Sequence, residues 1–241
     1  MTDASPSPAS APTGQLSPAE RQILRDTVLQ RKPRIVLEVG TWLGGGSTFH
    51  ILRALQENGQ GHLWGVEYVK SIYEQMIENI QAHAPDAWQR FTPLLGKSSE
   101  VIPQWIKEQP AGFQLDLAFL DGGDNPMEQV QEFELIDAHM PVGSILFAHD
   151  AKKRKAKWFS PYLRQLDHWK VEILDTSSVG LLRAEKIAAT PSPASLKAAR
   201  ADLARRRWEP IELVARFVPA PICAFVLKCL PRSICNKLGH P

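Results

Sequence analysis

Two rhythms of apolar and polar positions alternate along this chain from about residue 34 onward. Short, mainly apolar runs lie at residues 35–39, 62–66, 91–95, 115–120, 144–148, 170–174 and 179–182. Segments of helical period separate the first five runs, and in one of them Tyr73, Met76 and Ile80 share a face. Strands without a polar face are buried on both sides, as in a parallel sheet covered by helices. The pattern therefore predicts an α/β domain.

The last two apolar runs predict a hairpin. A turn of four residues, 175–178, separates residues 170–174 from residues 179–182. Such a turn is too short for the crossover helix that parallel strands require, so these two strands are expected to pair antiparallel. The predicted sheet is therefore doubly wound, mostly parallel and seven-stranded, and it ends in an antiparallel hairpin.

Composition divides the chain into three parts. Residues 1–16 are small, polar and proline-rich, which predicts a disordered lead. Ser17 and Pro18 then have the pattern of an N-cap followed by the first helical residue, so a helix is expected up to about Gln30. The α/β domain is expected to cover residues 17–186, followed by a helical extension over residues 187–241.

The extension is basic and partly apolar. Residues 187–241 contain nine Lys or Arg against three Asp or Glu, a balance of +6 within a chain whose net charge is +2. No apolar stretch reaches the roughly 18 residues that a membrane span needs. Two interpretations stay open: packing on the body or on a second subunit, and peripheral attachment to an anionic membrane surface.

Charge and cysteine usage restrict the setting of the protein. A net charge of +2 with 22% charged residues gives no reason to expect a nucleic-acid partner. The three cysteines all lie in the last twenty residues, so no disulfide framework is expected. The first residues lack the basic start and apolar run of a signal peptide. A cytoplasmic protein is predicted, with the tail as the one element that could hold it at a membrane.

Residues 34–48, RIVLEVGTWLGGGST, combine a strand, a glycine turn and the start of a helix. Gly40 and Gly44 allow the backbone to turn tightly and to approach a ligand without a Cβ in the way. Ser47 or Thr48 can cap the helix that follows. Ligands of open parallel sheets bind outside the carboxyl ends of the strands, so the segment predicts a nucleoside pocket.

Two acidic residues accompany the glycine turn. Glu38 lies two residues before Gly40, and Glu67 follows Gly40 by 27 residues at the end of the second strand. A carboxylate in the second position can accept hydrogen bonds from both ribose hydroxyls. The spacing GxxxGGG is not the dinucleotide motif GxGxxG, and Glu38 would repel a pyrophosphate. These two features make an NAD-dependent oxidoreductase the least favoured of the functions that a nucleoside pocket allows.

Together these motifs resemble the class I S-adenosylmethionine-dependent methyltransferases, whose fold is Rossmann-like with a C-terminal hairpin. The resemblance covers roughly residues 17–185. It implies S-adenosylmethionine as cofactor, with Glu38 near its methionine moiety and Ser98, after the third strand, beside the adenine. Trp42 is expected in the wall of the glycine loop. For Ser98 an N-cap role in the next helix is the alternative.

Further polar residues follow the fourth and fifth predicted strands. The segment LDGGD contains Asp121 and Asp124, and the segment AHD contains His149 and Asp150. These segments resemble the small-molecule O-methyltransferases of the catechol type and of the bacterial sugar type, in which equivalent residues hold a divalent cation. The resemblance implies Asp121, His149 and Asp150 as ligands of Mg²⁺ or another divalent cation, with Asp121 also close to the cofactor.

A hard cation gives this site a chemical purpose, because it can bind adjacent hydroxyls and favour the alkoxide. Asp121 and Asp150 would organise metal and substrate. Many relatives have histidine where this chain has Asp124, so Asp124 is open to three interpretations: a metal ligand, a general base or a residue at a helix start. The basic run 152–157 is either a solvated helix start or an attractor of anionic substrates.

The predicted function is S-adenosylmethionine-dependent methylation of an oxygen on a small hydroxylated metabolite or sugar, with Asp121, Asp150 and Asp124 as the candidate catalytic residues. The alternative is a methyltransferase-like binding module without catalysis, which the tail would deliver to a partner or membrane. Fold alone does not decide between them.

Overall fold

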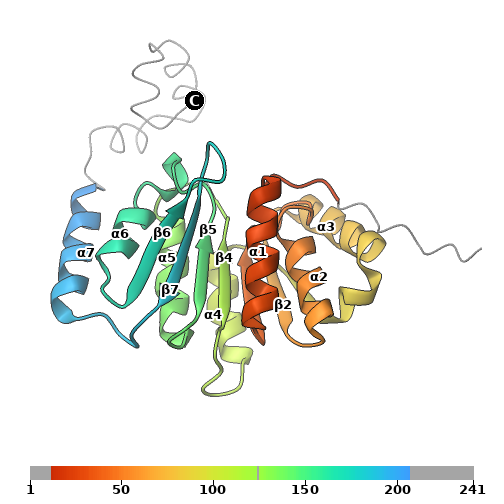
Figure 1. Cartoon of the computed structure of the whole chain (residues 1–241), viewed down its shortest axis with the longest axis horizontal. Helices are drawn as coiled ribbons and strands as arrows, with labels where there is room; N and C mark the ends of the chain where they lie inside the picture. The colour runs from red at the N-terminus through yellow and green to blue at the C-terminus, as the bar shows by residue number, and fades with distance from the viewer. Residues whose placement is uncertain (1–11, 124, 207–241) are drawn as a thin grey trace, which may run out of the picture.

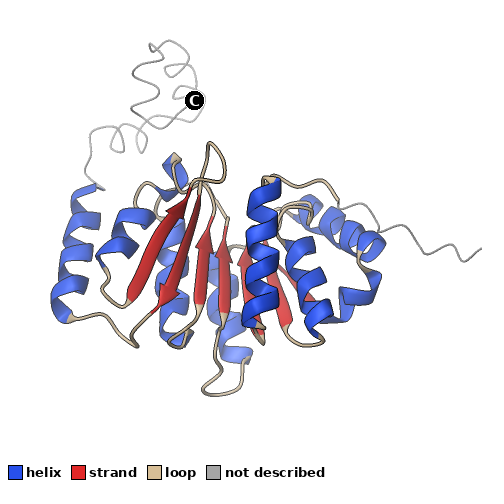
Figure 2. Ribbon diagram, viewed as in Figure 1, coloured by secondary structure: helices blue, strands red, loops and turns tan. Residues whose placement is uncertain are grey.

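A seven-stranded sheet forms the centre of the computed structural model, which describes residues 12–123 and 125–206 (Figures 1 and 2). Its strands are β1 (Ile35–Val39), β2 (His62–Glu67), β3 (Phe91–Leu95), β4 (Leu117–Leu120), β5 (Ile145–Ala148), β6 (Trp169–Leu174) and β7 (Leu181–Lys186). The strand order is β3-β2-β1-β4-β5-β7-β6. Only β7 runs antiparallel to its neighbours, β5 and β6, which confirms the predicted hairpin.

Helices cover both faces of the sheet. They are α1 (Pro18–Arg31), α2 (Thr48–Asn58), α3 (Lys70–His83), α4 (Ser98–Glu108), α5 (Glu128–Ile136), α6 (Phe159–Gln165) and α7 (Pro193–Arg206), with shorter 3₁₀ turns η1 (Pro85–Arg90), η2 (Asp137–His139) and η3 (Arg154–Ala156). Figure 1 shows α1 and α2 in front of the sheet, α4 and α5 behind it, and α7 beside α6 at the outer edge.

Side chains of β1 alternate between two hydrophobic cores. Val36 packs with the core under α1, α2 and α3, whereas Leu37 and Val39 pack with the core under α4, α5 and α6. All three side chains are buried, each contributing on the order of 1.5–3 kcal/mol relative to exposure. The strand is apolar throughout because both of its faces are covered, as the sequence pattern predicted.

Register brings the carboxyl ends of the central strands to one level. Val39 at the end of β1 pairs with Val66 of β2 and with Leu120 of β4, and Leu120 pairs with Ala148 of β5. The residues that follow these strand ends therefore meet at one edge of the sheet, where open α/β folds bind ligands.

Helix α1 begins as predicted. The Ser17 hydroxyl accepts a hydrogen bond from the Glu20 amide at 3.3 Å, and the Ser17 amide donates to the Glu20 carboxylate at 2.8 Å. This reciprocal capping box fixes the start of the helix. Lys32 closes it in the left-handed conformation, with φ of 50°.

The last strand, predicted at residues 179–182, lies at Leu181–Lys186. Lys186 pairs with Trp169 across the hairpin and is almost fully buried. Its ammonium donates to the Asp137 carboxylate at 2.9 Å and lies over the Trp169 ring at 5.6 Å from the centroid. The pattern placed the strand too early because a lysine ordinarily marks an exposed strand end, and the partner that buries this one is distant in sequence.

Residues 12–16, which belong to the predicted disordered lead, lie against the glycine loop in the structure. Leu16 is buried, and the Gly14 carbonyl accepts a hydrogen bond from Arg21 at 2.9 Å. A Cβ on Gly45 would lie 1.9 Å from the carbonyl oxygen of Pro12, so the two backbones touch. The rest of the lead, residues 1–11, lies outside the described residues.

The predicted helical extension begins with α7, whose Ala199 and Leu203 are buried against the body. The remainder of the extension, residues 207–241, lies outside the described residues, and so do the predictions of membrane attachment or self-association through it. Among the helices within residues 12–206, none combines the length and the apolar character that crossing a membrane requires.

Candidate active site

A cavity of about 730 Å³ lies at the carboxyl edge of the sheet, within the size range of small-molecule sites. The predicted residues that line it are Gly40, Trp42, Glu67, Ser98, Asp121 and Asp150. Glu132 of α5 and Lys155 of η3 also line it, as does Gln15 from the N-terminal segment. The cavity thus joins the predicted cofactor loop to the predicted reacting residues.

Gly40 is where the loops after β1 and β4 come closest. Its φ is 88°, and a Cβ there would lie 2.6 Å from the Asp121 carbonyl carbon and oxygen. Only glycine satisfies both the conformation and the space. Trp42 holds a left-handed φ of 46° in the same loop, a conformation that costs energy for a bulky side chain.

The Glu67 carboxylate is held on the cavity wall by backbone amides. One oxygen accepts from the Trp42 amide at 3.0 Å, and the other accepts from the Tyr68 and Val69 amides at 2.9 and 3.0 Å. A carboxylate has about four lone-pair sites, so acceptor capacity is left for a ligand. In nucleoside-binding α/β folds, an acid at about this position accepts hydrogen bonds from ribose hydroxyls.

Three predicted cofactor residues, Glu38, Gly44 and Ser47, lie outside the cavity lining. The fully buried Glu38 carboxylate accepts a hydrogen bond from the Ser47 hydroxyl. Burial raises the pKa of Glu38 to about 7, although hydrogen bonds from Ser47 and Thr48 oppose the shift. Ser47 occupies the N-cap position of α2 as expected, but its hydroxyl donates to Glu38 and makes no capping hydrogen bond. The contact between Ser47 and Glu38 therefore holds the glycine loop against β1 on the side away from the cavity.

Gly44 serves packing in this structure. It has φ of 84°, and a Cβ there would lie 3.0 Å from the terminal carbon of Ile80 and 3.3 Å from Met76. The glycine thus lets the loop sit directly on α3. The two glycines singled out in the sequence have different jobs, since Gly40 faces the cavity and Gly44 faces the core.

Ser98 lines the cavity and donates a hydrogen bond to Glu132 at 2.7 Å. The N-cap position of α4 is Lys97, so the alternative that Ser98 caps this helix is wrong. Burial raises the pKa of Glu132 to about 7, with the Ser98 hydrogen bond opposing. Sequence analysis missed Glu132. A signal existed, because this acid lies between Val130 and Phe133 on the buried face of α5.

The structure brings Asp121, His149 and Asp150 together after β4 and β5. One ligand atom from each lies within 4.8 Å of the others. His149 Nδ1 is 3.4 Å from an Asp121 oxygen and 3.8 Å from an Asp150 oxygen. Asp150 has φ of 58°, an unfavourable backbone conformation for an aspartate at a strand end. The third predicted acid, Asp124, lies outside the described residues.

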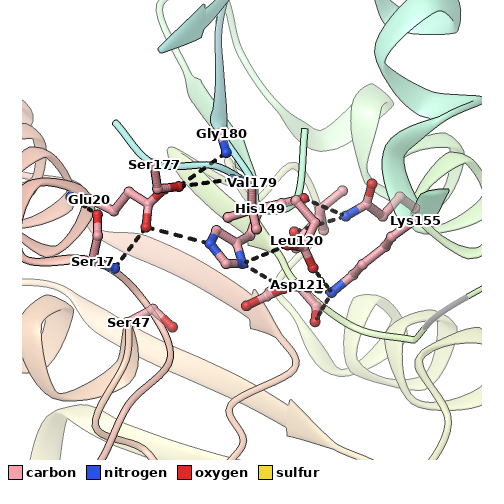
Figure 3. A network of polar contacts seen from close by, with 12 residues as sticks. Ser17, Glu20, Ser47, Leu120, Asp121, His149, Lys155, Ser177, Val179 and Gly180 are labelled. Atoms are coloured by element: carbon pink, nitrogen blue, oxygen red, sulfur yellow. Dashed lines mark hydrogen bonds and ion pairs between the residues drawn. The ribbon is translucent and has the colours of Figure 1, made fainter. Parts of the chain in front are cut away.

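A lysine from the basic run sits in this acidic group. Lys155 Nζ donates to the Asp121 carboxylate at 2.5 Å and to the Asp121 carbonyl at 2.6 Å (Figure 3). It also lies 3.8 Å from the Asp150 carboxylate. The lysine is buried, unlike the exposed Lys152 of the same run, which pairs with Asp175. Neither interpretation of the basic run 152–157 predicted that Lys155 would be buried. Its partner, Asp121, lies 34 residues earlier in the chain, so no local signal in the sequence indicates the pairing.

On the other side, His149 faces the N-terminal helix. Its ring lies between Asp121 and Glu20, with Nε2 3.6 Å from a Glu20 oxygen (Figure 3). Burial alone would lower the pKa of His149, but the hydrogen bond to Asp121 and the charges of Asp121, Asp150 and Glu20 raise it. Glu20 also accepts hydrogen bonds from Thr176 at 2.9 Å and Ser177 at 2.7 Å. The capping residue of α1 thereby joins the site to the β6–β7 turn.

These contacts bear directly on the predicted divalent cation. The oxygens of Asp121 and Asp150 already face the Lys155 ammonium. Two unit charges 4 Å apart interact by about 4 kcal/mol at an effective dielectric constant near 20, so an ammonium beside a divalent ion would suffer roughly twice that repulsion. The residues as arranged do not fit a divalent cation in addition to Lys155.

Comparisons with known proteins agree with the fold. Residues 37–151 match the model of a family described as methyltransferase domain. The search against curated proteins finds no match.

Several solved structures share the architecture. The O-methyltransferase TomG of Streptomyces achromogenes, in complex with SAM, is 17% identical, with a TM-score of 0.62 over 72% of this chain and 82% of that chain. An O-methyltransferase from Bacillus cereus, in complex with SAH, is 19% identical, with a TM-score of 0.62 over 73% and 84%. A methyltransferase from Geobacter sulfurreducens is 14% identical, with a TM-score of 0.58 over 72% and 81%. At these identities the likeness concerns the fold.

Strand order, the position of the cavity and the matched domain define the class. Dinucleotide-binding folds have the order 3-2-1-4-5-6, without an antiparallel strand inserted beside the fifth. Here β7 occupies that place between β5 and β6. The chain therefore has a Rossmann-like methyltransferase fold, and its residues 37–151 match a methyltransferase domain.

Proposed function

We propose that this protein methylates an oxygen of a small hydroxylated molecule, with S-adenosylmethionine as the methyl donor. The observation that carries the proposal is the Glu67 carboxylate, held by three backbone amides on a cavity wall that continues to Asp121 and Asp150. Two of the similar structures are described as O-methyltransferases and contain SAM or SAH, which supports both the donor and the kind of acceptor.

The donor fits the residues present. Gly40 leaves the backbone open at the place where a Cβ would collide, and Glu67 has acceptor capacity for ribose hydroxyls. Glu132 presents a buried carboxyl group to the same cavity, and its second oxygen has no hydrogen-bond partner among the residues that the structure describes. We assign Gly40, Trp42, Glu67 and Ser98 to the nucleoside and Asp121 to the region between donor and acceptor.

Bound S-adenosylmethionine would supply an electrophilic methyl carbon, to which the acceptor oxygen bonds as the carbon–sulfur bond breaks and the sulfur keeps the electron pair. The residues of this chain act on the acceptor. Asp150 lines the cavity and can take the hydroxyl proton, because burial raises the pKa of this carboxyl although His149 and Lys155 oppose the shift. Holding the oxygen in line with the methyl group supplies much of the rate. The role of Asp124 stays a prediction.

Calorimetric titration with S-adenosylhomocysteine tests the cofactor site. We expect the wild type to bind, and Glu67→Ala to bind at least about tenfold more weakly, which is about 1.4 kcal/mol. The matched control is Glu57→Ala, which removes an exposed carboxylate of α2 that pairs with Arg25 and lies outside the cavity. Absence of binding by the wild type, for both S-adenosylmethionine and its product, would contradict the proposal.

Transfer of labelled methyl groups to a panel of hydroxylated acceptors then tests catalysis. Labelled product that disappears in Asp150→Asn supports methyl transfer through the proposed base. Retained cofactor binding without product across the panel would favour the non-catalytic binding module.

A further inference from the structure

We propose that the Lys155 ammonium takes the place of a divalent cation in this methyltransferase, so that the acceptor oxygen is held by a lysine and no metal is used. This inference rests on the proposed function and extends it to the chemistry of the acceptor site. It is carried by the position of one side chain, between the two carboxylates that the sequence marks as metal ligands.

The Lys155–Asp121 pair is built into the fold. Asp121 follows β4 and Lys155 lies in η3, and their side chains are 15% and 10% exposed. The ammonium contacts both the carboxylate and the backbone carbonyl of Asp121, at 2.5 and 2.6 Å. A buried ammonium requires this kind of pairing, because an unpaired charge loses its hydration without compensation. The folded protein therefore needs this contact, whereas the pairs that exposed lysines make on a surface contribute little to stability.

The third predicted metal ligand, His149, faces carboxylates on both sides. His149 has one ring nitrogen 3.4 Å from Asp121 and the other 3.6 Å from Glu20. A metal-bound histidine also directs its second nitrogen to a carboxylate, so the orientation of His149 is compatible with either occupant. The inference therefore depends on Lys155, whose ammonium supplies the positive charge between Asp121 and Asp150.

An ammonium in this place implies a particular class of acceptor. Lys155 lines the cavity and has three N–H donors, of which Asp121 accepts two. The remaining donor is assigned to the acceptor oxygen, whose developing anion it stabilises. A metal ion can chelate two adjacent hydroxyls, but an ammonium binds as a single point charge. The site therefore suits an acceptor with one reacting hydroxyl and has no requirement for a vicinal diol.

Binding of Mn²⁺, followed by its electron paramagnetic resonance spectrum, tests the proposal without an acceptor. We expect the wild type to leave the spectrum of free Mn²⁺ unchanged. Lys155→Met should bind the ion at least about tenfold more tightly, a change of the size that neighbours of metal ligands cause. The double variant Asp121→Asn with Lys155→Met should lose this binding. Lys152→Met, which removes an exposed charge from the same run, and Lys155→Arg, which keeps the charge, should behave like the wild type.

Two results would overturn the proposal: Mn²⁺ binding by the wild type that Asp121→Asn abolishes, or a folded Lys155→Met that binds no more Mn²⁺ than the wild type. The first needs no lysine variant, so the test stands even if Lys155→Met fails to fold. Calorimetry with S-adenosylhomocysteine on the same samples reports on the proposed function separately, because it probes Glu67 at the other end of the cavity.

Discussion

The two ends of the cavity are held together by different groups: the proposed cofactor end contains Glu67, and the proposed reacting end contains Asp121 and Asp150. At the cofactor end, backbone amides hold Glu67, and Gly40 leaves room for a ligand. At the reacting end, charged side chains from α1, β4, β5 and η3 hold one another, with Asp121 between His149 and Lys155. The first end depends on where the chain turns, and the second depends on which charges meet. Their responses to substitution and to pH should differ accordingly.

The largest expected effect is at the cofactor end. Gly40→Ala adds a Cβ that would lie 2.6 Å from the Asp121 backbone at a φ of 88°, so both overlap and strain oppose folding. We expect a loss of about 3 kcal/mol or more in the free energy of unfolding, and loss of S-adenosylhomocysteine binding. Gly59→Ala is the matched control, with φ of 68° and nothing within 4 Å of its Cβ. Its cost should be about 1 kcal/mol, with binding kept. Equal losses in the two variants would show that the close approach is unimportant.

An effect of comparable size, confined to a change of pH, is expected from the carboxyl group of Glu38. The pKa of Glu38 is about 7 in the folded protein and 4.5 in the unfolded chain, so stability falls as pH rises from about 4.5 to 7 and is level above that. At 1.36 kcal/mol for each pKa unit, the fall is on the order of 3 kcal/mol. Glu38→Gln should remove this part of the pH dependence and leave the part that Glu132 contributes, whereas Glu57→Gln should keep both. Urea unfolding at pH 5 and pH 8 measures both, and a Glu38→Gln profile parallel to that of the wild type would contradict the assignment.

The smallest effect is expected at the reacting end. The pKa of His149 is raised above 6.5, so its charge contributes stability that is fully present below pH 6.5 and is lost as pH rises through the raised value. The difference in unfolding free energy between the wild type and His149→Gln should therefore shrink from pH 6 towards pH 9. A difference that grows over this range would mean that the histidine is held in its neutral form.

The segment from β1 to β2 could be predicted because its signals are local. The glycine turn, Glu38 and Glu67 belong to one strand–loop–helix–strand segment, and the strands follow from the apolar runs. The sequence did not show that Glu38, Gly44 and Ser47 lie outside the cavity lining, because that depends on how the loop packs.

At the reacting end, the sequence predicted the carboxylates but not the lysine that pairs with them. Asp121 and Asp150 follow from their strands, but the contact of Lys155 depends on how η3 folds back over β4.

Glu20 and Glu132 were missed for a related reason. Each looks in sequence like an ordinary helix residue, a cap in α1 and an acid in α5. Their burial arises because Glu20 faces the β6–β7 turn and Glu132 faces Ser98 of α4. Contacts between elements that are distant in the chain leave no periodic signal, so only the structure could show them.

The left-handed backbone of Asp150 has a consequence for selection on stability. A non-glycine residue with φ of 58° costs about 1–3 kcal/mol, which glycine at the same position would largely recover. Selection for heat resistance alone would therefore favour glycine there. Asp150→Gly should raise the melting temperature while it removes the proposed base. Laboratory evolution for a higher melting temperature should reach residue 150 early, at the cost of that carboxylate.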